Sequence, residues 1–152
     1  MLFRDLLLIM GATFCFSIIS NIRGKNKYFA ALGGGIAWLF YSISINQLNL
    51  GIYSVLTASM AAGIYSEIMA RVLKAPVTAF VICSIIPLVP GGAMYNTMLQ
   101  AVEGHVEASI SLGIQAIATA AYIAVGVFLI TSSFRLFAII KKKLELKKHH
   151  PV

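Results

Sequence analysis

Four long uncharged stretches, separated by short charged clusters, divide the amino-acid sequence. They cover residues 6–22, 28–66, 75–102 and 108–134. The hydrocarbon core of a bilayer is about 30 Å thick, so one helical span takes about 20 residues. The second stretch is about twice that length, and residues 46–51 in its middle are rich in Asn, Gln and Gly, which is typical of a turn. This stretch therefore predicts two helices.

The pattern predicts an all-α integral membrane protein with five transmembrane helices. A break rich in proline and glycine follows the fourth span. We expect the whole chain to form a single membrane domain, with a basic tail at residues 135–152. The expected spans are residues 6–22, 28–45, 51–70, 75–89 and 109–134.

The positions of Lys and Arg indicate the orientation in the membrane. They occur in the first loop at residues 23–27, in the third loop at Arg71 and Lys74, and in the tail at residues 141–148. The second and fourth loops carry neither residue type. Because positively charged loops stay in the cytoplasm, we expect the N-terminus outside and the C-terminus in the cytoplasm, in the inner membrane of a bacterium.

The composition excludes a soluble protein. Hydrophobic residues make up 59% of the chain and charged residues 11%, and the mean hydropathy is +0.88. These values rule out a classical soluble enzyme and a nucleic-acid-binding domain. The net charge of +7 does not indicate nucleic acid either, because five of the twelve Lys and Arg lie at residues 141–148. A basic tail after an apolar span is typical of a cytoplasmic membrane anchor.

The chain contains no motif for nucleotide hydrolysis, for a serine hydrolase or for a zinc protease. Cys15 and Cys83 lie inside apolar spans without CxxC or Cys/His spacing, and the histidines lie in a polar loop and in the tail. Neither a disulfide, a metal site nor a cofactor is indicated. The sequence predicts that the protein is not an enzyme.

Glu67 is the one acidic residue inside the apolar body of a predicted span. Arg71 follows four residues later, the spacing at which an acid and a base meet on one face of a helix. The two residues form either a structural ion pair near the interface or a coupling site, because burial in a membrane makes an acid a candidate proton carrier. Glu67 lies only about 6 Å deeper than Arg71, which leaves both interpretations open.

The densest signal lies at residues 85–95. Pro87 and Pro90 remove two backbone donors and bend or end a helix. Gly91 and Gly92 let the backbone turn and approach its surroundings closely. A break of this kind inside a membrane must be buried in protein or face water.

Residues 93–102 after the break are compatible with a helix. The free N–H groups at the start of such a helix would form an anion site of the kind that broken transporter helices use for carboxylates. About 24 Å of helix separates Ala75 from the break, which places it in the outer third of the membrane. Three interpretations of the break therefore remain open: an external gate, a plain helix terminator and the main binding site.

A polar stripe leads into the last span. Its members recur every four residues and lie on one drifting face of a helix: Glu103, Glu107, Ser111, Gln115 and Thr119. The stripe either lines a path toward a partner or satisfies hydrogen bonds between helices. Small residues in the second and third spans, such as those at 33–35, indicate close helix packing, and Trp38 in mid-span is interpreted as filling a gap between helices.

These residues resemble a known family. Glu67, Arg71 and Pro76 at their spacing, followed by the run at 86–92 and by Tyr95, are similar to the threonine/serine exporter family. Five spans and a glycine-rich second helix fit the same family. The chain resembles in particular its small membrane subunit, equivalent to the C-terminal half of the longer fused members, and the resemblance covers essentially the whole chain.

The resemblance implies a membrane subunit of a secondary exporter of small amino acids such as threonine or serine. It also implies a second membrane subunit as partner, in a homo- or hetero-oligomer, and the lack of an internal repeat independently favours such a partner. A dicarboxylate exporter subunit and a non-transporting assembly or scaffold subunit are the alternatives. The candidate coupling residues are Glu67 and Arg71, and the candidate substrate-binding or gating residues are Pro87, Pro90, Gly91, Gly92, Tyr95 and Gln115.

Overall fold

The computed structural model of the protein describes residues 2–149. The described residues form helices and connections without any strand, so the all-α prediction is confirmed. Element η1 is a short 3₁₀ helix that continues α4. In chain order the elements are α1 (Leu2–Ile19), α2 (Asn26–Asn46), α3 (Tyr53–Val72), α4 (Val77–Ile85), η1 (Ile86–Leu88), α5 (Gly91–Val102) and α6 (Val106–His149).

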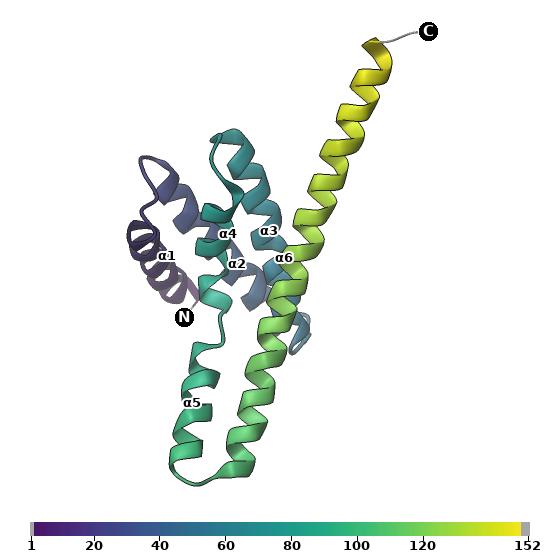
Figure 1. Cartoon of the computed structure of the whole chain (residues 1–152). Coiled ribbons are helices and arrows are strands. Elements are labelled where there is room, and N and C mark those ends of the chain that lie inside the picture. Colours follow the sequence, from purple (N-terminus) through teal and green to yellow (C-terminus); the bar gives the residue numbers. More distant parts are fainter. Residues whose placement is uncertain (1, 150–152) are drawn as a thin grey trace.

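Helix α2 lies at the centre of a bundle formed by α1 to α4 with η1 (Figure 1). It contacts α1, α3 and α4, and α3 in turn contacts α4 and α6. Helix α5 leaves the bundle and packs mainly along α6. We refer to residues 91–119, which comprise α5 and the part of α6 beside it, as the hairpin. The hairpin projects beyond the bundle, and α6 then runs back along α3 and past the other end (Figure 1).

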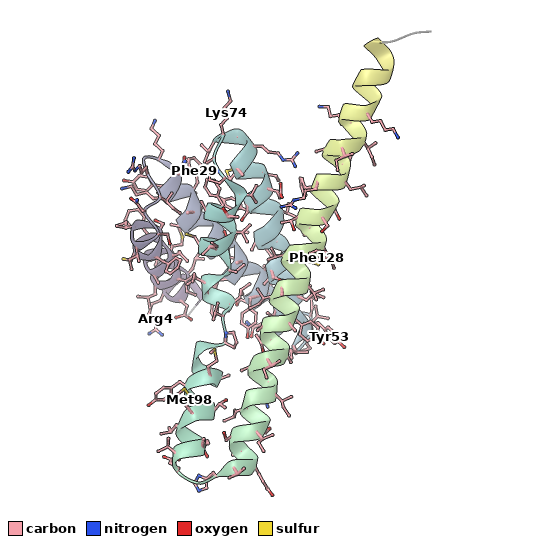
Figure 2. The ribbon with its side chains drawn as sticks, viewed as in Figure 1. Arg4, Phe29, Tyr53, Lys74, Met98 and Phe128 are labelled. Atoms are coloured by element: carbon pink, nitrogen blue, oxygen red, sulfur yellow. The ribbon has the colours of Figure 1, made fainter. Side chains whose placement is uncertain are left out.

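The loops that carry Lys and Arg lie at one end of the bundle. The α1–α2 and α3–α4 connections both lie at this end, where Figure 2 labels Lys74, and the C-terminal part of α6 extends beyond it (Figure 1). The α2–α3 and α5–α6 connections lie toward the opposite end. We refer to the end with the α1–α2 and α3–α4 connections as the basic end.

Three consecutive glycines let neighbouring helices approach α2 closely. A Cβ atom at Gly33 would overlap Ser84 of α4, and one at Gly34 would overlap Thr13 of α1. At Gly35 the Cβ atom would lie 2.9 Å from the Cγ atom of Met10. Close packing holds membrane helices together because lipid provides no hydrophobic driving force between them. The packing role predicted for these small residues is therefore confirmed.

Glycine also sets the crossing of α3 and α6. A Cβ atom at Gly126 would overlap the hydroxyl of Ser59 and would lie 3.1 Å from the carbonyl oxygen of Leu56. Nearer the basic end, a Cβ atom at Gly63 would lie 3.2 Å from Cβ of Ile130. Helix α6 is thus held against α3 by one glycine from each helix.

Two helical segments are long and apolar enough to cross a membrane on their own, namely α2 and residues Val106–Lys141 of α6. The α4–η1 segment and α5 meet the same requirement together, with a bend of 53° between them. The described residues therefore contain two candidate spans, or three if the bent pair is one span, as expected for a membrane protein. The five-span arrangement stays a prediction.

Helix α6 is longer than the predicted last span. It runs for 44 residues, or about 66 Å, whereas the span was expected at residues 109–134 with a separate tail. No Gly or Pro interrupts residues 127–149, and the Lys, Leu and Glu residues there are good helix formers. The basic tail therefore continues the helix, while residues 150–152 of the predicted tail lie outside the described residues.

Candidate functional site

The chain breaks between η1 and α5. Pro87 lies inside η1, Val89 has an extended backbone, and Pro90 precedes the first residue of α5. The two prolines lack backbone N–H donors, so the α-helical ladder of α4 cannot continue through them. After the break the N–H of Gly91 donates to the carbonyl oxygen of Val89 (2.8 Å), and the N–H of Met94 donates to that of Pro90 (3.0 Å).

A cavity of about 550 Å³ lies beside this break. It is a partly open cavity lined by the C-terminal half of α2, the start of α3, η1 with the residues after it, and α6. Gly51 and Ile52 line it together with Pro90, which places it at the end of the bundle away from the basic end. Val55 and Leu88 line it as well and also belong to a buried apolar cluster. A buried apolar cluster therefore borders the cavity.

The cavity brings together three of the residues predicted from the sequence. Pro87 and Pro90 line it from one side, and Gln115 of α6 lines it from another, with Thr119 one turn further along. None of the residues that line it carries a charge. The cavity suits a small, polar ligand with no net charge, because an uncompensated charge is costly to remove from water.

The other predicted residues of this segment lie outside the cavity, on α5. A Cβ atom at Gly91 or at Gly92 would meet no atom within 4 Å, and Tyr95 is 66% exposed. The close approach that the paired glycines led us to expect is therefore absent within the described chain. The physical reason is the 53° bend, which directs α5 away from the bundle so that none of its residues is buried.

The start of α5 keeps unpaired backbone donors. Among the described residues, the N–H groups of Gly92 and Ala93 donate to no backbone or side-chain acceptor. Such donors are normal in the first turn of a helix, and they favour negatively charged groups. Because Pro90 lines the cavity and α5 begins directly after it, these donors lie near the cavity rim.

The polar stripe of the sequence divides into two parts in the structure. Only Gln115 and Thr119 line the cavity, and the hydroxyl of Thr119 donates to the carbonyl oxygen of Gln115 (2.8 Å). The remaining members lie further from the bundle, along the hairpin. A single continuous path of five side chains is therefore not formed within the described chain.

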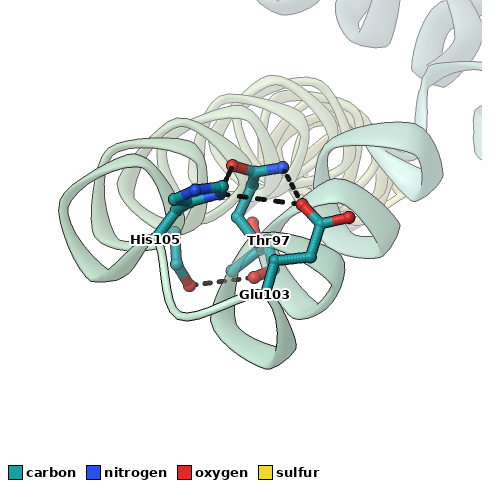
Figure 3. A network of polar contacts seen from close by, with 5 residues as sticks. Thr97, Glu103 and His105 are labelled. Atoms are coloured by element: carbon teal, nitrogen blue, oxygen red, sulfur yellow. Dashed lines mark hydrogen bonds and ion pairs between the residues drawn. The ribbon is translucent and has the colours of Figure 1, made fainter.

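Glu103, the first member of the stripe, belongs to a polar network at the α5–α6 turn, as Figure 3 shows. The amide of Gln100 donates to the carboxylate of Glu103 (3.0 Å), and its oxygen lies 3.1 Å from Nδ1 of His105. The hydroxyl of Ser109 donates to the carbonyl oxygen of Thr97 (2.8 Å), which ties α6 to α5. These contacts join the end of α5, the turn and the start of α6, which favours a structural role.

The Glu67–Arg71 pair lies near the other end of α3. Glu67 is 5% exposed, and its carboxylate lies 3.3 Å from the guanidinium group of Arg71. The guanidinium also lies 5.0 Å from the ring centre of Phe134 on α6, so the pair connects α3 to α6. At 1.5 Å per residue, Glu67 lies about 18 Å along α3 from Val55 in the cavity wall. The predicted coupling residues and the cavity are thus separate sites on the same helix.

Trp38, which the sequence analysis interpreted as filling a gap between helices, also borders the cavity. The side chain lines the cavity, and its indole N–H is buried without a hydrogen-bond partner. The ring lies 5.4 Å from that of Tyr41, which lines the cavity one turn later. The signal that could have found this residue is the mid-span position of a donor-bearing aromatic, since a buried indole N–H normally has a partner.

The chain matches a known family over most of its length. The family is described as "Threonine/Serine exporter, ThrE", and the match covers residues 5–133. No curated protein and no solved structure matches the chain significantly. The matched region includes the break, the cavity and the Glu67–Arg71 pair.

Proposed function

Because the chain belongs to the threonine/serine exporter family, we propose that it is a membrane subunit of a secondary exporter that moves small amino acids such as threonine and serine. The observation that supports this most is the uncharged cavity of about 550 Å³ between the break and α6. A threonine or serine zwitterion has no net charge, so it suits a cavity without charged side chains better than a dicarboxylate does.

The proposed site consists of the cavity and its rim. Pro87, Pro90 and Gln115 contact the substrate in the cavity, and the donors at the start of α5 attract its carboxylate at the rim. The open space around Gly91 and Gly92 leaves room there for the substrate or for a partner chain. Tyr95 belongs to the same exposed face of α5 and acts in gating.

The proposed membrane arrangement has five crossings, made by α1, α2, α3, the bent α4–η1–α5 pair and α6. The basic end faces the cytoplasm of a bacterial cell, since positively charged loops are retained there. The N-terminus then lies outside and the C-terminal part of α6 inside. The arrangement of the connections in Figure 1 supports this orientation, because loops with and without Lys or Arg lie toward opposite ends.

Site-specific labelling tests the orientation. Single cysteines at positions 25, 49 and 143 are introduced after Cys15 and Cys83 have been replaced, and intact cells are treated with a membrane-impermeant thiol reagent. Labelling at position 49 with protection at 25 and 143 is expected. Rapid labelling at 25 or 143 with protection at 49 would show that the orientation is reversed.

Glu67 and Arg71 are assigned to energy coupling in this proposal. Glu67 is buried, whereas the side chain of Arg71 is half exposed at the basic end. A buried acid whose partner reaches solvent is a candidate for proton uptake from the cytoplasm. Its position between α3 and α6 lets a change in the pair alter how these two helices pack.

A second membrane subunit completes the proposed exporter. Apolar side chains of α5 lie exposed in the described chain, among them Met94 and Met98, which Figure 2 labels. Gln115 is exposed on α6. Inside a membrane its amide would be stabilised by hydrogen bonds to a neighbouring protein chain. The partner is either a different chain of the same family or a further copy of this one.

Transport in liposomes tests the proposal. Liposomes containing the chain with its copurified partner are loaded with radiolabelled threonine or serine, and efflux is measured with and without a pH gradient. We expect efflux from the complex and none from the chain alone. Efflux of a C4 dicarboxylate but not of threonine or serine would assign the alternative substrate class. A complex that moves none of these compounds would favour a scaffold subunit.

A further inference from the structure

The indole N–H of Trp38 is a hydrogen-bond donor without an acceptor. It is the only side-chain nitrogen or oxygen found buried and unpartnered among the described residues. Most buried polar groups in proteins are hydrogen-bonded, and each exception requires an explanation. Inside a membrane the requirement is stricter, because no bulk water reaches the donor.

The position of Trp38 provides an explanation. The side chain forms part of the wall of the cavity, next to Tyr41 on the same helix and across from Gln115 on α6. The rings of Trp38 and Tyr41 are tilted by 36° and lie 5.4 Å apart, so Tyr41 supports the indole on one side. The donor therefore belongs to a residue that borders a space large enough for a small molecule.

The polar groups that line the cavity differ in whether they already have a hydrogen-bond partner. Pro87 and Pro90 have no backbone N–H, and the hydroxyl of Thr119 is already bonded within α6. The side chains of Tyr41 and Gln115 make no hydrogen bond to any described residue. The cavity thus combines three uncommitted polar side chains, from Trp38, Tyr41 and Gln115, with an apolar floor.

We propose that the indole N–H of Trp38 binds the substrate by donating a hydrogen bond to a carboxylate oxygen. The inference rests on the proposed function and adds a binding residue to its site. The nitrogen is shielded from solvent, so this binding includes a rotation of the indole that turns its N–H into the cavity. The ligand then satisfies a donor that the protein leaves unpaired, which favours binding.

This role differs measurably from packing. A tryptophan that only fills a gap needs its ring, whereas a binding residue needs its N–H group. Trp38→Phe keeps an aromatic ring and removes the donor. The loss of one hydrogen bond to a charged group corresponds to a decrease of about tenfold or more in affinity.

Trp38 is the only tryptophan of the chain, so ¹⁵N-tryptophan labelling of this chain gives one indole signal in the assembled complex. Titration of the complex in lipid nanodiscs with L-threonine is expected to shift the indole proton downfield in a saturable manner. L-Threoninol, which carries an alcohol in place of the carboxylate, is expected to leave the signal in place. The absence of a shift with threonine, or the same shift with threoninol, would overturn the inference.

Export by the same complex distinguishes this inference from the proposed function. Trp38→Phe is expected to lower kcat/KM for threonine about tenfold, while Phe40→Leu, on the same helix but away from this cavity, leaves it unchanged. Wild-type export together with unchanged export by Trp38→Phe would overturn the role of Trp38 and leave the exporter intact. A wild-type complex that moves neither threonine nor serine would overturn both.

Discussion

The bundle and the hairpin differ in how far their side chains are buried within the chain. In the bundle, α2 buries small residues from Ala30 to Ser44 against three other helices. In the hairpin, α5 buries none of its residues, and its side chains include Met98 at 72% and Val102 at 87% exposure. Both regions are apolar, but among the described residues the buried apolar clusters lie in the bundle and in the part of α6 that crosses it.

The contrast shows which region the described chain leaves uncovered. Small residues let the helices of the bundle approach until backbone and side-chain contacts replace lipid. The long side chains of α5 leave the hairpin to be covered by lipid or by another protein. The cavity lies where the two regions meet, because α2, the start of α3 and η1 line it from the bundle and Gln115 and Thr119 line it from the hairpin.

The largest expected effect comes from a side chain placed in the bundle. Gly34→Val would overlap Thr13 of α1, and overpacking of this kind costs about 3 kcal/mol. We expect most of the protein to be lost from the folded fraction. Fluorescence-detected size-exclusion chromatography after heating measures this loss.

The matched variant in the hairpin is Gly92→Val, where an added Cβ atom meets no atom within 4 Å. We expect its thermal stability to match that of the wild type while threonine export falls, because the new side chain would enter the rim that we propose for the substrate or the partner. Equal loss of stability in Gly34→Val and Gly92→Val would show that the two regions do not differ as described.

A smaller effect on stability is expected from substitutions on α6, the helix that contributes to both regions. Gly126→Ala places a Cβ atom against Ser59 and near the carbonyl of Leu56, so it should destabilise the α3–α6 crossing by about 1–2 kcal/mol. Gly113→Ala meets only the methyl group of Thr97, at 3.4 Å. It should be neutral or stabilise the helix by up to about 1 kcal/mol, because Ala has the higher helix propensity.

Thermal unfolding of the two α6 variants in the same detergent provides the comparison. A destabilised Gly113→Ala, or an unaffected Gly126→Ala, would contradict the assignment of tight packing to the bundle and open packing to the hairpin.

The smallest effect on stability, with a clear effect on transport, is expected at Glu67. Glu67→Gln keeps the size of a buried side chain and removes its charge, so the fold should persist while proton-driven export falls about tenfold, or about 1.4 kcal/mol in barrier height. Transport driven by a pH gradient in liposomes measures the effect. If Arg71→Ala impairs folding while Glu67→Gln exports normally, the pair is structural.

The helices of the bundle could be predicted from the sequence because charge clusters and turn residues mark their ends. The predicted second span at residues 28–45 compares with α2 at Asn26–Asn46, and the third at 51–70 with α3 at Tyr53–Val72. The ion pair of Glu67 with Arg71 followed from their spacing of four residues. Local patterns were sufficient for these features.

The cavity depended on contacts that no local pattern contains. Pro87 and Gln115 lie far apart in the sequence, and their meeting is set by the bend after η1 and by the crossing of α3 and α6. The same bend left Gly91 and Gly92 in open space, where the sequence had suggested close packing. The unpaired indole N–H of Trp38 could not be predicted either, because its position in the sequence indicates burial and not whether the N–H has an acceptor.

Threonine export with a filled cavity tests the central claim most directly. Ile52→Trp adds bulk from the cavity rim, where the residue is partly exposed, and Leu48→Trp adds the same bulk to the neighbouring loop outside the cavity. In liposomes that contain the complete complex, we predict that Ile52→Trp abolishes threonine efflux with normal assembly, while Leu48→Trp retains it. If a correctly assembled Ile52→Trp complex releases threonine at the rate of the wild type, the claim that substrate passes through this cavity is contradicted.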